Sequence, residues 1–156
     1  IAPDLRGHGR SYRPASIGDW GVTGDDLVPL IDGLGPKVTL IGVGHSMGGV
    51  CVTRAAAARP QRFVHLVLVD PVVFDPAFYA SSSKETVGDP DDHFVSRRRN
   101  QWTSAQDMAA RFAERFPYSG WDPAVLADYA AHGLLPRAGG DGFELACPPR
   151  LEASAY

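Results

Sequence analysis

The chain of 156 residues is long enough for one domain of ordinary size, and 44% hydrophobic with 21% charged residues is typical of a soluble globular protein. The formal net charge of -3 excludes a general electrostatic attraction to nucleic acid or to an anionic membrane, so a small-molecule substrate or a protein is the expected partner. Two cysteines are too few for a disulfide framework and lack the paired spacing of a zinc site, which favours a reducing cytoplasmic location.

The first segment of the chain has the pattern of a strand end, a loop and a helix. Ile1 and Ala2 have the character of the last residues of a strand, and "PDLRGHGRSYRPASIGDWG" is rich in turn-forming residues. The following "TGDDLVPLIDGLG" spaces its apolar residues as a helix does, with two acidic residues in the first turn. This pattern predicts a helix that begins at Thr23 and is stopped by Gly35.

A strand, a helix and a second strand come next. "KVTLIGVG" (37–44) is short, β-branched and apolar, as a strand buried on both faces is. "SMGGVCVTRAAAARP" then predicts a helix that Pro60 ends, and "RFVHLVLVDP" predicts a second buried strand that ends at Asp70. Two strands joined by a helix form a parallel βαβ unit with a right-handed crossover.

After Pro71 the pattern changes to loops and helices. "SSSKETVGDPDDH" is polar and has the composition of a linker. Ser104 is a suitable N-cap for a helix over 105–116, and Asp122 before a proline predicts a helix that Gly133 stops. A last helix is expected within "PPRLEASAY".

The sequence "GHSMG" lies where the first predicted strand gives way to the helix. A very tight turn at this junction forces Ser46 into a strained backbone conformation, and Gly44 and Gly48 give the room that the close approach of neighbouring backbone needs. The serine hydroxyl would then stand at the carboxyl end of a parallel sheet, where α/β proteins bind their ligands. This placement predicts that Ser46 is a nucleophile.

The residue after the serine begins the helix, so the N–H of Met47 is suited to hold the oxyanion that forms when Ser46 attacks a carbonyl. One such donor contributes roughly 3 kcal/mol to the transition state. The alternative interpretation is a serine N-cap on a glycine-rich loop that packs tightly or cradles a phosphate.

Three blocks of sequence together resemble the middle of an α/β-hydrolase fold protein of the serine-nucleophile, esterase- or lipase-like branch. They are "DLRGHGRS" (4–11), "GHSMGG" (44–49) and "LVLVDP" (66–71), in the order of that family. The resemblance implies an α/β fold with a parallel βαβ core of strands four to six over residues 1–71. It also implies that residues 72–156 form a helical cap, or lid, over the active site.

The same resemblance implies that strands one to three of the family precede Ile1. Strands seven and eight, with the loop of the catalytic histidine, would follow Tyr156. The chain is therefore expected to be an internal fragment that is inactive on its own. Neither a metal nor an organic cofactor is implied.

The remaining catalytic candidates are weaker. Asp70 is a candidate for the acid, because some members of the family carry it after strand six. Most members carry it after strand seven, so a role in bracing the loop before the cap is the favoured interpretation. Asp75 offers a weaker version of the same role. Five histidines are present, and we expect none to be the base: His8, His45, His65, His93 and His132. His65 is expected to be a buried core residue.

Two further groups have both a binding and a structural interpretation. Arg97 to Arg99 would suit a substrate carboxylate, or would be a solvated face paired with "DPDD". An aromatic and methionine set would line an acyl pocket or an ordinary core: Trp102, Met108, Phe112, Phe116 and Trp121. Cys51 is expected to be a buried apolar residue.

These observations predict a serine hydrolase that cleaves a carboxylic ester, or a similarly activated carbonyl, through an acyl-enzyme. The serine argues against the epoxide hydrolase and haloalkane dehalogenase branches, which carry aspartate at this position. Thioesterase, lactonase, C–C hydrolase and perhydrolase activities stay open. The alternative from another class is a hydrolase-like binding or regulatory protein without turnover.

Overall fold

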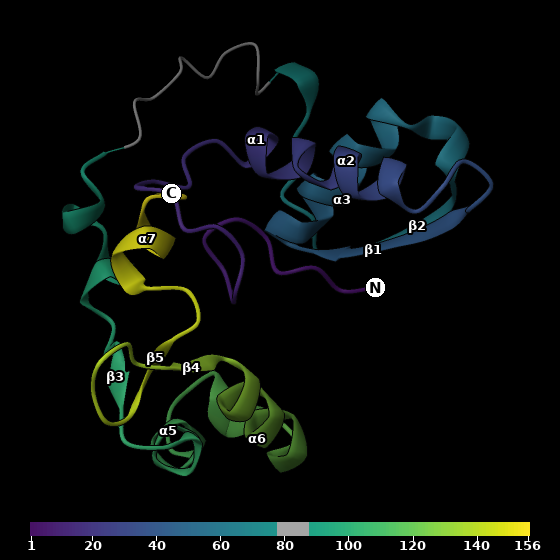
Figure 1. Cartoon of the computed structure of the whole chain (residues 1–156). Helices are drawn as coiled ribbons and strands as arrows, with labels where there is room; N and C mark the ends of the chain where they lie inside the picture. The colour runs from purple at the N-terminus through teal and green to yellow at the C-terminus, as the bar shows by residue number, and fades with distance from the viewer. Residues whose placement is uncertain (78–87) are drawn as a thin grey trace. The chain divides into compact units, whose positions relative to one another are not determined.

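The computed structural model describes residues 1–77 and 88–156, so most of the predicted linker lies outside the described residues (Figure 1). Two compact units are present. The β1–β2 unit comprises Ile17–Gly88 with Ala155, and the α5–α6 unit comprises Ile1–Ser16, Asp89–Ser154 and Tyr156. The division into a core of residues 1–71 and a cap of residues 72–156 has different bounds and stays a prediction.

The first predicted helix is in fact two helices, α1 (Trp20–Asp25) and α2 (Leu27–Gly33). α1 begins three residues earlier than expected because Asp19 caps it, its carboxylate accepting a 2.6 Å hydrogen bond from the Gly21 N–H. The break at Asp26 follows from Pro29, which has no N–H to donate to the carbonyl four residues earlier and whose ring crowds it.

The predicted βαβ unit is confirmed. The strands β1 (Leu40–His45) and β2 (Phe63–Val69) pair in parallel, and α3 (Met47–Ala58) with a short 3-10 turn η1 (Pro60–Arg62) connects them. α1, α2 and α3 lie on one side of the strand pair (Figure 1). Among these three helices α3 contacts the strands, and α1 and α2 pack on α3.

The strands are not buried on both faces, contrary to the expectation. The face toward α3 carries Gly42 and Gly44, which are buried, whereas Ile41 and Val43 on the other face are 62% and 66% exposed. The register pairs this open face with His65 and its alternate neighbours on β2, so His65 is exposed and is not the expected core residue. Within the described residues of the β1–β2 unit no element covers this face, because the sheet has two strands and its helices lie on the other side (Figure 1).

The α5–α6 unit contains the predicted helices and a small sheet that was not predicted. The helices are α5 (Ala105–Ala113), α6 (Pro123–His132) and α7 (Pro149–Ala153), with 3-10 turns η2 (Pro90–Asp92), η3 (Phe94–Arg97) and η4 (Tyr118–Gly120). The antiparallel sheet has the order β3 (Gln101–Trp102), β5 (Phe143–Leu145), β4 (Leu134–Pro136).

Both predicted N-caps of this unit are confirmed. Ser104 Oγ accepts a 3.0 Å hydrogen bond from the Asp107 N–H, and the Asp122 carboxylate accepts one of 2.8 Å from the Ala124 N–H. α5 ends three residues before the predicted Phe116, because the residue before Pro117 is disfavoured in a helix. Trp102, Met108, Ala130 and Leu134 form a buried hydrophobic cluster of this unit.

Candidate active site

Ser46 occupies the turn between β1 and α3 in a strained backbone conformation. Its φ is 50° and its ψ is -121°, a region that L-residues other than glycine rarely adopt and that costs about 1–3 kcal/mol. The side chain does not cap α3, and Ser46 Oγ has no hydrogen-bond partner among the described residues. Such strain is typical of a residue that the fold holds in place for a function.

Glycines allow the close approach that this turn requires. A Cβ on Gly44 would overlap the backbone of Gly48 and would lie 2.7 Å from the Gly49 nitrogen. A Cβ on Gly49 would lie 2.8 Å from the Cβ of Pro71, which follows β2, whereas one on Gly48 would meet open space. The predicted role of Gly44 is therefore confirmed, and the second steric requirement falls on Gly49 and not on Gly48.

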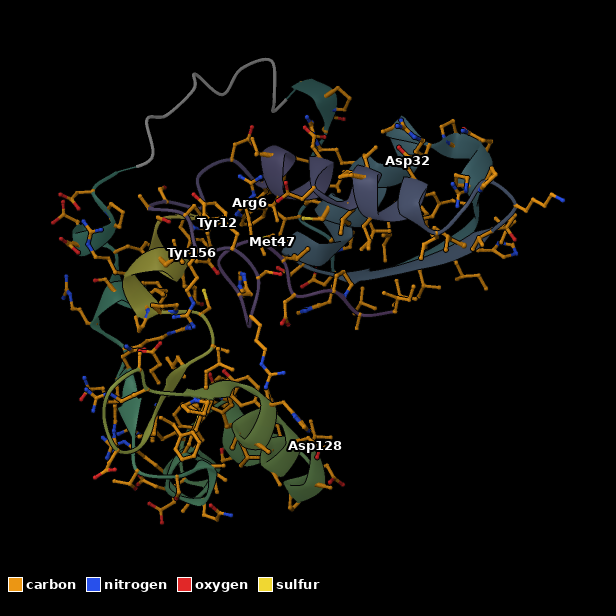
Figure 2. All side chains as sticks on the ribbon, viewed as in Figure 1. Arg6, Tyr12, Asp32, Met47, Asp128 and Tyr156 are labelled. Atoms are coloured by element: carbon orange, nitrogen blue, oxygen red, sulfur yellow. The ribbon has the colours of Figure 1, made fainter. Side chains whose placement is uncertain are left out.

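The first turn of α3 presents free donors directly after Ser46. The N–H groups of Gly49 and Val50 donate to the Ser46 carbonyl at 2.9 and 3.4 Å. The N–H groups of Met47 and Gly48 have no acceptor within residues 1–77 and 88–156. Met47 lies at the N-terminal end of α3 (Figure 2), where the positive end of the helix dipole favours an anion.

β2 fixes the backbone of the turn from the side. The Ser46 N–H donates a 3.1 Å hydrogen bond to the carbonyl of Val69, the last residue of β2. Because His45 and Val69 are paired in the parallel register, Ser46 and Asp70 each come one residue beyond the same end of the sheet. The structure thus places these two predicted site residues at one sheet edge.

Asp70, like Ser46, has a positive φ. Its φ is 42°, and Ser46 and Asp70 are the non-glycine residues with positive φ in the described part of the chain. The Asp70 carboxylate is exposed and accepts no hydrogen bond from the described residues. Asp75, by contrast, accepts a 2.7 Å hydrogen bond from the Ala77 N–H, which closes a local turn.

The described residues contain no hydrogen bond between a histidine and Ser46. In the β1–β2 unit His45 and His65 are exposed residues of the strands. In the α5–α6 unit His8 Nδ1 lies 3.0 Å from the Arg6 carbonyl, and the His93 ring stacks on Tyr156 at 4.9 Å. The base that Ser46 would need stays a prediction for a residue outside this chain.

The "DLRGHGRS" segment forms a closed loop in the α5–α6 unit. The Asp4 carboxylate accepts a 3.0 Å hydrogen bond from the Arg10 N–H, and the Asp4 backbone carbonyl accepts one of 2.6 Å from the Ser11 hydroxyl. Gly9 has a φ of 53°, and a Cβ there would overlap the Asp4 carboxylate. The loop therefore depends on glycine at this position.

Comparison with known proteins identifies the family. Residues 1–154 match the model of the Alpha/beta hydrolase family. The chain belongs to this family. The match spans both compact units of the chain.

Relatives in the alpha/beta hydrolase family include named enzymes. Lipase LipV of Mycobacterium tuberculosis is 43% identical over 74 residues, which are 46% of this chain and 27% of that protein. The type I acyl-CoA thioesterase mpaH of Penicillium roqueforti is 35% identical over 92 residues, 56% of this chain and 19% of that protein. The chain therefore spans a third or less of the length of these relatives.

A solved alpha/beta hydrolase structure has the same fold. The crystal structure of E-2-(acetamidomethylene)succinate hydrolase matches with a TM-score of 0.68 at 24% identity, and the match covers 96% of this chain and 51% of that one. The predicted α/β-hydrolase fold is confirmed, with about half of the related structure represented. In the described part of the chain no helix is long and apolar enough to cross a membrane.

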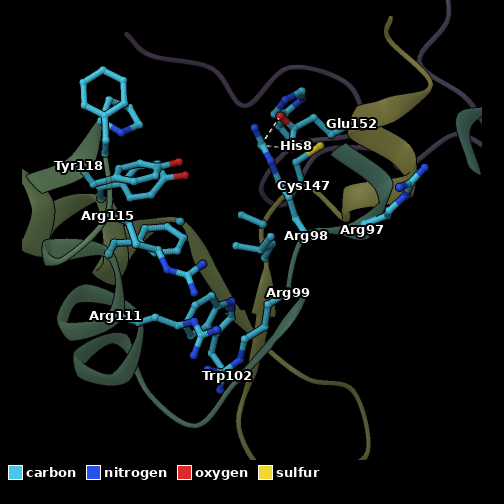
Figure 3. Close-up of a pocket in the computed structure, with 17 residues that line it drawn as sticks. His8, Arg97, Arg98, Arg99, Trp102, Arg111, Arg115, Tyr118, Cys147 and Glu152 are labelled. Atoms are coloured by element: carbon cyan, nitrogen blue, oxygen red, sulfur yellow. Dashed lines mark hydrogen bonds and ion pairs between the residues drawn. The ribbon is translucent and has the colours of Figure 1, made fainter. Parts of the chain in front are cut away.

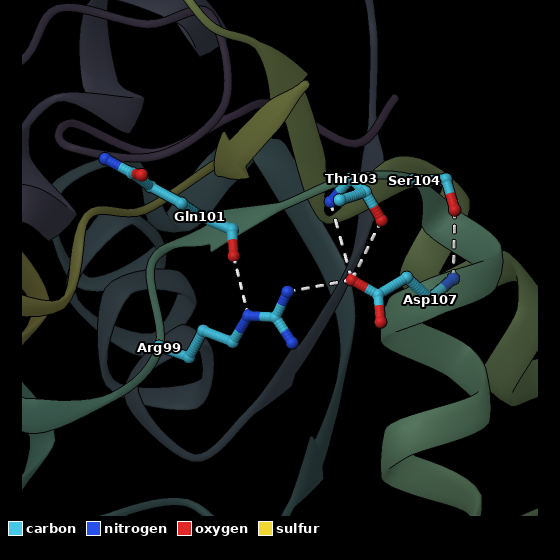
Figure 4. A network of polar contacts seen from close by, with 5 residues as sticks. All are labelled: Arg99, Gln101, Thr103, Ser104 and Asp107. Carbon is cyan, nitrogen blue, oxygen red and sulfur yellow. Dashed lines mark hydrogen bonds and ion pairs between the residues drawn. The ribbon is translucent and has the colours of Figure 1, made fainter. Parts of the chain in front are cut away.

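Arg98 and Arg99, in the arginine run of this alpha/beta hydrolase, have carboxylate partners. Arg98 pairs with Glu152 at 2.7 Å, and Arg99 pairs with Asp107 at 2.8 Å while also donating to the Gln101 carbonyl (Figure 4). Arg97 donates to the Asp92 carbonyl at 3.5 Å and has no carboxylate partner among the described residues. Neither the carboxylate of Asp91 nor that of Asp92 pairs with the run, so the predicted pairing with "DPDD" is not found as an ion pair.

The aromatic set divides between core and surface. Trp102 and Met108 are buried, Phe112 is half-buried against them, and Phe116 is 93% exposed. Cys51 is buried on α3 as predicted, and burial raises the pKa of its thiol to about 11. A thiol with this pKa stays protonated at neutral pH and is a poor nucleophile.

Proposed function

We propose that the whole protein is a serine hydrolase that cleaves a carboxylic ester or a similarly activated carbonyl through an acyl-enzyme. The observation that carries the proposal is the strained Ser46 with an unpartnered hydroxyl, followed directly by a free N–H at the start of α3. Membership of the alpha/beta hydrolase family supports hydrolysis as the class of reaction.

In the proposed reaction Ser46 Oγ attacks the carbonyl carbon, and its proton passes to a histidine base supplied outside this chain. The Met47 N–H donates to the oxyanion of the tetrahedral intermediate. Collapse of that intermediate expels the alcohol, which takes up the proton from the base. Water then attacks the acyl-enzyme and regenerates Ser46 with release of the acid.

Asp70 is our candidate for the carboxylate that orients the base. Its place one residue beyond the same end of the strand pair as Ser46 supports this role. We further propose that residues 1–71 belong to the catalytic core and residues 72–156 to a helical cap. We also propose a small-molecule substrate and a cytoplasmic location.

A fluorophosphonate probe on the whole protein tests the nucleophile. We expect covalent labelling of Ser46, detected by mass spectrometry of the modified peptide, and its loss in Ser46→Ala. The control is Ser119→Ala, which removes a serine hydroxyl from an exposed turn. A wild-type protein that is folded but not labelled at Ser46 would contradict the proposal.

Two alternatives stay open. A hydrolase-like binding or regulatory protein without turnover is the alternative from another class, and the same probe would leave it unlabelled. Similarity to the acyl-CoA thioesterase favours a thioester substrate. Rates with matched oxygen and thiol esters of the same acid distinguish an esterase from a thioesterase.

A further inference from the structure

The α5–α6 unit contains a cavity of about 740 Å³ whose lining residues all belong to that unit. The cavity is unusual in its charge, because five arginines and a single carboxylate line it (Figure 3). These charged residues are Arg97, Arg98, Arg99, Arg111, Arg115 and Glu152. The whole chain has a net charge of -3, so the positive charge is local to this cavity.

Among the described residues, carboxylates pair with two of the five guanidinium groups. Arg98 pairs with Glu152, and Arg99 pairs with Asp107. The guanidinium groups of Arg111 and Arg115 have neither a hydrogen-bond acceptor nor an ion-pair partner in the described part of the chain. Arg111 lies in the last turn of α5, Arg115 follows two residues after the helix ends, and both line the cavity.

Like charges that gather without partners repel one another, and an anion between them removes that repulsion. Arginine also has the geometry for this task, since its planar group gives two parallel hydrogen bonds to a carboxylate or a phosphate. The cavity therefore has both the charge and the donors to bind an anionic group.

The walls between the arginines are aromatic. Phe112 stacks on Tyr118 with ring centroids 4.4 Å apart, and Trp102 meets Phe112 edge to face at 5.4 Å. The Arg99 guanidinium lies 4.1 Å above the Trp102 ring. Such surfaces bind flat apolar groups by stacking.

Trp102, which lines the cavity, has a buried N–H without a hydrogen-bond partner among the described residues. Its side chain is 97% buried at the cavity wall, and its indole Nε1 has no hydrogen-bond acceptor among the described residues. A buried donor without a partner costs free energy, and an indole N–H can only donate. The Trp102 indole is therefore an unsatisfied donor within a residue that lines the cavity.

We propose that this cavity is a binding site for an amphipathic organic anion, with a flat apolar body against the aromatic walls and a carboxylate or phosphate between Arg111 and Arg115. The site does not depend on the reactivity of Ser46. Its occupant is recognised by charge and shape, so binding can be measured without any turnover.

Isothermal titration of the chain with three naphthalene compounds tests the proposal. 1-Naphthyl phosphate and 1-naphthoate carry the two candidate anionic groups, and 1-naphthol is the neutral compound of the same shape. We expect at least one anion to bind tenfold or more tightly than 1-naphthol, with an affinity that falls as salt is added. The anion that binds better identifies the preferred head group.

Variants locate the site. Arg111→Gln and Arg115→Gln should each weaken binding of the preferred anion about tenfold, whereas Arg150→Gln should not. Arg150→Gln is the matched control, because it removes the same charge from the same unit. Arg150 is exposed, pairs with Asp91 and does not line the cavity. Glu152→Gln should strengthen binding several-fold by releasing Arg98, a gain that loss of folding cannot produce.

Equal binding of the anions and 1-naphthol would overturn the proposal. So would equal affinity of Arg111→Gln, Arg115→Gln and Arg150→Gln for the preferred anion. Circular dichroism spectra of all variants ensure that the comparison is made between folded proteins.

Discussion

The serine turn depends on individual residues whose roles differ although they are all glycine. Gly44 faces the backbone of Gly48, and Gly49 faces the ring of Pro71, while Gly48 has space beside it. The sequence pattern alone did not distinguish these positions, because the motif is symmetric about Ser46. The distinction arises from how β1, α3 and the residue after β2 pack together.

Gly44→Ala should lower the free energy of unfolding by about 3 kcal/mol or more, because its Cβ would overlap backbone that cannot move away cheaply. Gly48→Ala is the matched control. Its Cβ meets open space in the first turn of α3, so stability should be equal or up to about 1 kcal/mol higher. Urea unfolding measures both. Equal losses in the two variants would contradict the packing described for this turn.

Cys51 gives a pH dependence of stability. Burial raises the pKa of its thiol from 9.0 to about 11, so the native state holds the proton more tightly than the unfolded chain does. The resulting stabilisation is complete below pH 9 and is lost as the pH rises toward 11, a change on the order of 2 kcal/mol. Urea unfolding at several pH values checks this.

The control for that experiment is Cys51→Ala, in which the decline above pH 9 should become shallower. It should not vanish, because burial also raises the pKa of the Cys147 thiol, to about 12. An unchanged slope in Cys51→Ala would show that the Cys51 thiol is not the source.

At the scale of elements, local signals in the sequence predicted helix starts well where a capping side chain is present. Ser104 and Asp122 cap the helices that they were expected to cap. The start of α1 was missed because the cap, Asp19, lies within a stretch that was taken as loop. The break between α1 and α2 was missed because apolar periodicity continues across it while Pro29 interrupts the hydrogen bonds.

The small antiparallel sheet could not be predicted from the sequence pattern. Its strands are two or three residues long, too short for an alternation of apolar and polar residues to be recognised. Their pairing also joins residues about 40 apart in the chain, such as Trp102 and Phe143. The cavity lined by arginines could not be predicted either, because nothing in the run at 97–99 indicates that Arg111 and Arg115 lie near it.

Ser104→Ala should destabilise the α5–α6 unit by about 1 kcal/mol, because the Asp107 N–H loses its acceptor at the start of α5. Ser104→Asp is the control that keeps an acceptor and should have nearly wild-type stability. Thermal unfolding followed by circular dichroism compares the variants. A full loss in Ser104→Asp would mean that the hydroxyl has a role other than capping.

At the scale of the whole molecule, the α/β-hydrolase fold was predictable because three motifs occur in the order of the family. The burial of β1 and β2 was not predictable in the same way. An apolar strand pattern indicates that a strand suits a buried position, but it does not show which elements pack on each face. In the structure an apolar face of β1 and β2 is open, with Val43, Val67 and Val69 at least half exposed. Open strand edges and apolar faces favour association between chains.

The 156-residue chain should therefore self-associate in a concentration-dependent manner, as measured by sedimentation velocity. A double variant, Val43→Thr with Val67→Thr, keeps β-branched residues on the open face but makes it more polar, and should shift the equilibrium toward monomer. Val125→Thr on α6 is the control, since Val125 is similarly exposed outside the strand pair. Self-association that is equal in the double variant and the control would exclude this face as the contact.

The hydrogen bond from the Ser46 N–H to the Val69 carbonyl has a consequence for amide exchange with deuterated water. Exchange requires an N–H to lose its acceptor, so the Ser46 amide should exchange only when β1 and β2 separate. The Met47 amide, one residue later and without an acceptor in the described residues, should exchange without any opening of the fold. Two adjacent amides would thus mark the boundary between the part of the turn that holds the serine in place and the part that is left available to a ligand.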